Sequence, residues 1–76
     1  MSRVSIDRTN NEVVLTFNHN FYSRELIHNA IADFRNICEP HFEEDKLILK
    51  PKSSDVRLDI LGYEFYNYVL GLMKSR

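Results

Sequence analysis

Hydrophobic and polar residues alternate from Val4 to Asp7, and a β-rich run follows from Val13 to Phe17. Between them lies a polar cluster of one arginine, one threonine and two asparagines at positions 8–11. Alternation is typical of a strand with one buried face, and asparagine tolerates the left-handed backbone conformation of tight turns. The pattern therefore predicts a β-hairpin.

The next hydrophobic residues recur with the period of an α-helix. Ser23 is a suitable N-cap, because its hydroxyl can accept a hydrogen bond from a backbone N–H in the first turn. Polar residues lie largely opposite the hydrophobic ones, so we expect a helix with one buried stripe that its own domain covers. The stripe consists of Leu26, Ile27, Ala30, Ile31 and Phe34.

A second hairpin is predicted from Ile37–Glu43 and Lys46–Pro51, with Glu44 and Asp45 as the turn between them. Proline has no backbone N–H to donate across a sheet. Pro40 therefore indicates that the first of these two strands lies at an edge of the sheet or is irregular.

The last third of the chain reads as one helix from Val56 to Met73, preceded by a polar break at residues 52–54. We expect Ser54 or Asp55 to cap it. With successive residues about 100° apart, its apolar arc is roughly 220° wide, where a surface helix needs only about 100°. The central stripe of this arc is Leu58, Leu61, Phe65, Tyr68, Val69 and Leu72.

A second apolar stripe lies beside the central one and consists of Tyr63, Tyr66, Leu70 and Met73. A small domain has little material with which to cover so wide an arc, and tyrosine is enriched at protein interfaces. We therefore expect this stripe to bind another chain. Tyr68 borders the central stripe and is assigned to the domain's own core.

The order of elements is β-β-α-β-β-α within a single domain covering residues 1–76. It predicts an α+β fold of two layers, an antiparallel sheet with both helices on one face. A hydrophobic content of 43% is typical of a folded globular chain rather than a disordered one.

Ten Lys and Arg residues balance eleven Asp and Glu residues, for a formal net charge of −1. This balance argues against a nucleic-acid partner, whose phosphates need clustered positive charge, and against a membrane-surface helix.

Cys38 is the only cysteine, so no internal disulfide can form. With no apolar leader after Met1 and no apolar run of membrane-spanning length, we expect a soluble cytoplasmic protein.

Few residues have the spacing of a chemical site. Cys38 and His41 could form half of a zinc site, but His19 and His28 supply no second spaced pair. Residues three apart on a strand point to opposite faces, which argues against Cys38 and His41 as a nucleophile and its base. The acidic run at residues 43–45 lacks the spacing of a calcium loop. No catalytic residue, metal or cofactor is therefore assigned.

Three segments carry a resemblance to a known family. They are the aromatic-serine helix start Phe21-Tyr22-Ser23, the strand Leu47-Ile48-Leu49-Lys50-Pro51, and the helical Glu64-Phe65-Tyr66-Asn67-Tyr68-Val69-Leu70. In this layout the chain resembles the small D protein of the bacterial His-Xaa-Ser system. The resemblance implies an accessory role, in which the protein helps partner radical-SAM enzymes to mature a ribosomally made peptide. It implies no catalytic residues.

The residues and the resemblance together predict a non-enzymatic protein-interaction module, either an accessory subunit or a homodimer, that binds through its C-terminal helix. The alternative is a small metal-dependent or thiol enzyme that uses Cys38 and the nearby histidines. A nucleic-acid-binding module is the third possibility.

Overall fold

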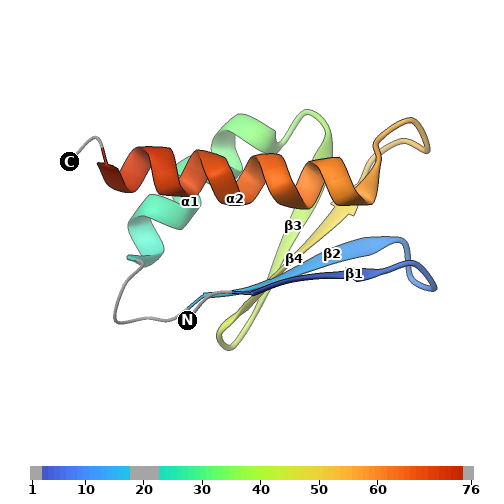
Figure 1. Ribbon diagram of the computed structural model, residues 1–76, viewed down its shortest axis with the longest axis horizontal. Helices are drawn as coiled ribbons and strands as arrows, with labels where there is room; N and C mark the ends of the chain where they lie inside the picture. The colour runs from blue at the N-terminus through green and yellow to red at the C-terminus, as the bar shows by residue number, and fades with distance from the viewer. Residues whose placement is uncertain (1–2, 18–22, 75–76) are drawn as a thin grey trace.

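The computed structural model describes residues 3–17 and 23–74. In chain order its elements are β1 (Arg3–Asp7), β2 (Glu12–Thr16), α1 (Arg24–Phe34), β3 (Cys38–Glu43), β4 (Lys46–Pro51) and α2 (Leu58–Lys74). The strands form one antiparallel sheet in the order β1-β2-β4-β3. Both helices cover the same face of this sheet (Figure 1). The predicted two-layer α+β fold is confirmed.

Local side-chain chemistry closes the first hairpin. Asp7 is paired with Glu12, and its carboxylate accepts hydrogen bonds from the backbone N–H of Asn10 at 3.1 Å and from the Asn10 side-chain amide at 2.8 Å. Asn11 has φ 54°, the left-handed conformation expected of an asparagine in this turn. The expectation for the polar cluster is thus met at Asn11.

The second hairpin turns at Glu44 and Asp45, as expected. Glu44 itself adopts the left-handed conformation, with φ 52°. Pro40 lies in β3, and β3 forms one edge of the sheet. The interpretation of Pro40 as an edge residue is confirmed, since its missing N–H removes no bond from a central strand.

The N-terminal cap of α1 is the predicted one, because the Ser23 hydroxyl accepts a hydrogen bond from the Leu26 N–H at 3.1 Å. The cap predicted for α2 is wrong. The Ser53 hydroxyl accepts from the Asp55 N–H at 3.0 Å and forms a separate local turn, which competes with helix. The helix begins at Leu58, so neither Ser54 nor Asp55 directly precedes its first turn.

The core lies between the sheet and the two helices. Phe65 and Val69 of α2 are fully buried, and Leu26, Ile27, Ala30 and Ile31 of α1 are nearly so. Phe34, also predicted for the core, is only partly buried against it. The sheet contributes alternate residues of its helix-covered face: Val13, Leu15, Phe17, Cys38, Leu47 and Leu49.

Gly62 allows α2 to approach the sheet closely. A Cβ atom added at Gly62 would lie 2.9 Å from Cγ1 of Val4 and 3.0 Å from Cγ1 of Val13. Real Cβ atoms do not approach other carbons so closely, so glycine sets the distance between α2 and the first two strands.

No helix of the described residues is both long and apolar enough to cross a lipid bilayer.

Candidate interaction surface

The two flanks of α2 have different surroundings. The helix packs over β1 and β2, and α1 packs against one of its sides. On that side the Tyr68 hydroxyl donates a hydrogen bond to the Asp33 carboxylate, and the Tyr68 ring lies 5.6 Å from that of Phe34. Tyr68 therefore joins the two helices, in agreement with its assignment to the domain itself.

The predicted stripe lies on the other flank of α2, which faces away from α1 and toward the free edge of β1. The helical period sets this direction, because Tyr66 follows Gly62 by one turn and Gly62 touches β1. Tyr63 is 69% exposed, the highest fraction among the large hydrophobic residues described. Tyr66, Leu70 and Met73 are partly buried against the core cluster.

The structure thus divides the predicted stripe into one exposed ring and three residues that already touch the core. Ile60, which belongs to neither predicted stripe, is 44% exposed and lies one turn from Tyr63 and Glu64. Ile60 and Tyr63 are neighbours at i and i+3, so the exposed apolar surface of α2 is centred nearer its N-terminal half than was predicted.

Val4 and Ile6 of β1 form a second exposed apolar feature that was not among the predicted site residues. They lie on the helix-covered face and are 37% and 38% exposed, whereas Val13 and Leu15, their partners in β2, are fully buried. The sequence signals this surface only weakly. Alternation identifies the strand, but a position at the sheet edge depends on the order of all four strands.

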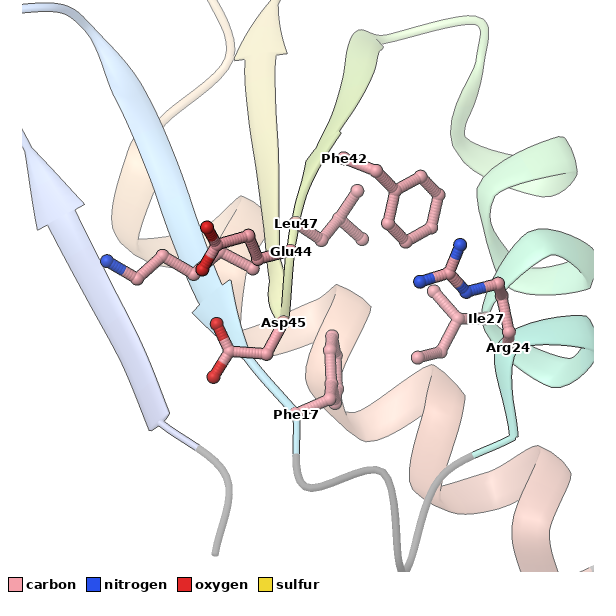
Figure 2. Close-up of a pocket in the computed structure, with 8 residues that line it drawn as sticks. Phe17, Arg24, Ile27, Phe42, Glu44, Asp45 and Leu47 are labelled. Carbon is pink, nitrogen blue, oxygen red and sulfur yellow. The ribbon is translucent and has the colours of Figure 1, made fainter.

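A small pocket lies between the start of α1 and the β3–β4 turn (Figure 2). The Arg24 guanidinium lies 5.7 Å from the centre of the Phe42 ring, and these two side chains face each other, whereas the Glu44 and Asp45 carboxylates point away from Arg24. The pocket has a volume of about 20 Å³, which is enough for about one water molecule. The pocket is therefore too small for a substrate. Its remaining lining residues are Phe17, Ile27, Lys46 and Leu47.

The face of the sheet opposite the helices carries a row of alternating charges. Lys50 is paired with Glu39 of β3, and its ammonium lies 4.0 Å from the Glu12 carboxylate. Ile48 and His41 lie in the next row. Opposite charges on neighbouring strands attract each other only weakly in water. An open hollow of about 400 Å³ lies over this face and is lined by Glu12, Glu39, Pro40, His41, Ile48 and Lys50.

The thiol and the histidines do not come together. Cys38 is 1% exposed, its Sγ donates to the Phe34 carbonyl oxygen at 3.3 Å, and burial raises the pKa of the thiol. His41 is exposed on the opposite face of the same strand, as expected. His28 is exposed too, with its ring 4.9 Å from that of Phe42.

This arrangement does not give Cys38 the surroundings of a reactive thiol. Thiolate is the reactive form of cysteine, and a raised pKa keeps Cys38 protonated at neutral pH. Within residues 3–17 and 23–74, no three His, Cys, Asp or Glu side chains are grouped closely enough to hold a metal ion. His19 lies outside the described residues.

Comparison of the chain with protein-family models, with curated proteins and with solved structures finds no match in any of the three. The likeness to the small D protein therefore depends on the three segments quoted above. Phe21 and Tyr22 of the first segment lie outside the described residues, whereas Ser23 is the cap of α1.

Proposed function

We propose that the protein is a non-enzymatic interaction module that binds another polypeptide through the flank of α2 that faces away from α1. The observation that carries the proposal is the exposure of Tyr63, 69%, beside apolar residues that are only partly buried. Isolated apolar residues are common on protein surfaces. Adjacent ones on one helix flank are typical of binding surfaces.

The state of the neighbouring residues makes this flank suitable for binding. Tyr66, Leu70 and Met73 already pack against the core, so their rotamers are restricted before a partner arrives. A partner that covers their remaining surface would gain apolar burial with little further loss of side-chain entropy. Tyr63 would supply the central anchor, with an apolar ring and a hydroxyl that can stay hydrated at the rim.

The kind of partner is proposed from the family resemblance. If the chain is an accessory protein of a His-Xaa-Ser system, the partner is a radical-SAM enzyme or its peptide substrate in the cytoplasm. The same flank also suits a homodimer. Nucleic acid is a poor partner for it, because Lys74 is the one basic residue of α2, and Arg57, just before the helix, is paired with Asp59 at 2.9 Å.

The test is Tyr63→Lys, with Asn29→Lys as the matched control. Both side chains are exposed on a helix and both changes add one positive charge, but Asn29 lies on α1, away from this flank. Association is measured by light scattering of the chain alone and by titration with a radical-SAM protein of a His-Xaa-Ser system. We expect Tyr63→Lys to weaken association at least about tenfold, as for an interface anchor, and Asn29→Lys to leave it unchanged.

A stronger variant combines Tyr66→Lys with Leu70→Glu and should abolish association while the far-ultraviolet circular dichroism stays that of the native chain. Because both residues touch the core, its thermal unfolding is measured as well. Unfolding of this variant would assign the stripe to the core. The proposal is refuted if Tyr63→Lys associates as strongly as the native chain does, both with itself and with the radical-SAM protein.

A further inference from the structure

The two edges of the sheet are unequally protected. Edge strands invite pairing with other chains, and proteins commonly block them with proline or charged side chains. The β3 edge carries Pro40, with Glu39, His41 and Glu43 on its exposed face. The β1 edge has no proline, and its only charged residues, Arg3 and Asp7, stand at its two ends. Within the described residues, no strand pairs with the outer side of β1.

The apolar residues of β1 are also incompletely covered. Val4 and Ile6 face the helix layer but remain 37% and 38% exposed, because they have a neighbouring strand on one side only. A strand added alongside β1 would cover them on the other side. It would also pair the outward backbone groups of β1.

We infer that a second copy of this chain pairs antiparallel with β1 across a two-fold axis through Ser5. In this register Ser5 meets its own copy, and Val4 lies opposite Ile6 on the helix-covered face. An aliphatic cross-strand pair of this kind is favourable, and a two-fold axis requires such self-complementarity. A second copy is therefore favoured over an unrelated strand.

The same axis brings the α2 helices together. A two-fold axis perpendicular to a continuous sheet keeps the helices of both copies on the same face, and each α2 lies over β1 and β2. With strands about 4.8 Å apart, the two α2 axes would be about 10 Å apart, near the spacing of packed helices. The flank that carries Tyr63 would then face the copy, so here we build on the function proposed above.

The register can be tested by a disulfide between copies. Ser5→Cys places a thiol at the axis, and His41→Cys is the matched control. Both positions are exposed and lie in one cross-strand row, Ser5-Val14-Ile48-His41, at opposite edges of the sheet. Cys38 is buried and does not compete.

In this test, mild oxidation should link Ser5→Cys into dimers at a rate that does not fall on dilution, because the two thiols are already adjacent. His41→Cys should link slowly and in proportion to concentration. Light scattering of the unmodified chain should give about twice the mass of one chain, which is 9.0 kDa. Equal linking rates at the two positions, or the mass of one chain at every concentration, would overturn the inference.

Charge at the axis separates this inference from the function proposed for α2. Ser5→Lys should reduce the mass to that of one chain, because two lysines would meet at the axis, and His41→Lys should not. Loss of self-association in Ser5→Lys, with intact binding of a radical-SAM protein, would support the β1 dimer and leave α2 free for the other partner. If Tyr63→Lys abolishes self-association and Ser5→Lys does not, the β1 dimer is wrong and the α2 interface stands.

Discussion

The helices α1 and α2 cover the same sheet face and use their hydrophobic residues differently. In α1, four residues are buried, Phe34 is partly buried, and the remaining side chains are exposed and polar except Ala32. In α2, five residues are buried and several others are partly buried, while Ile60, Tyr63 and Tyr68 remain exposed. Nearly all the hydrophobic residues of the first helix are covered by its own domain. The second has more apolar surface than the sheet and α1 cover.

This difference raises the question of which apolar residues of α2 are covered by the domain itself and which are not. Tyr68 looks like surplus on a helical projection, but its ring packs on Phe34 and its hydroxyl binds Asp33 of α1. Tyr63 has no such contact with α1, being on the other flank. An apolar arc wider than one stripe can thus serve a second element of the same domain on one side and a partner on the other.

The largest expected effect compares Phe34 of α1 with Phe65 of α2, the phenylalanines that the two helices pack against each other. Phe65 is fully buried and meets Phe34 edge to face, with 5.0 Å between the ring centres, whereas Phe34 is partly exposed. Phe65→Ala should lower the free energy of unfolding by about 3–5 kcal/mol, and Phe34→Ala by roughly half as much. Urea unfolding monitored by circular dichroism measures both.

A domain of this size has a modest total stability, so Phe65→Ala is expected to leave the chain close to unfolded. An equal or larger loss in Phe34→Ala would show that α1 supplies the central contact of the core. The comparison between the helices would then be reversed.

A smaller effect compares the two glycines of α2. Alanine favours helix over glycine by about 1 kcal/mol, so Gly71→Ala, with nothing within 4 Å of the new methyl group, should stabilise the domain by about 0.5–1 kcal/mol. In Gly62→Ala the methyl group would overlap Val4 and the fully buried Val13. Overpacking should outweigh the helical gain and give a net loss of roughly 1 kcal/mol.

Thermal unfolding of the two alanine variants checks this pair under identical conditions. Stabilisation by both substitutions would mean that α2 can move away from the sheet without cost. The distance between α2 and β1 would then be set by something other than Gly62.

The elements could be predicted from the sequence because their signals are local. The Ser23 cap, the Asn11 turn and the strand alternation each depend on residues a few positions apart. The start of α2 was misplaced because Ser54 and Asp55 are both suitable cap residues by type. In the structure the Asp55 N–H binds the Ser53 hydroxyl in a local turn, and the helix begins at Leu58.

The candidate surface could be predicted only in part. The period of α2 correctly separates a flank that contains Tyr63 from the central stripe. It cannot say how far the sheet extends beneath that flank. Tyr66 was therefore assigned to the interface with another chain, whereas the structure buries it partly against the domain's own core. The exposed edge of β1 and the contact between Tyr68 and Asp33 depend on elements distant in sequence, and no local pattern encodes them.

The smallest expected effect concerns the contact that joins the helices. The hydrogen bond from Tyr68 to Asp33 raises the pKa of the Tyr68 phenol above its usual 10.0, with smaller contributions from desolvation and from the charge of Asp33. The folded chain therefore holds the phenolic proton more tightly than the unfolded chain does. The resulting stabilisation is complete below the unfolded pKa and is lost as the pH rises through the folded pKa.

Tyr68→Phe removes this proton and with it the alkaline loss. Urea unfolding from about pH 8 to about pH 11 should show a steeper decline in stability for the native chain than for Tyr68→Phe. Tyr63→Phe is the matched control, because it removes a hydroxyl from the exposed flank of the same helix and should keep the native decline. If Tyr68→Phe and Tyr63→Phe decline alike, the phenol of Tyr68 does not join α1 to α2. The contrast between the two flanks of α2 would then rest on ring packing alone.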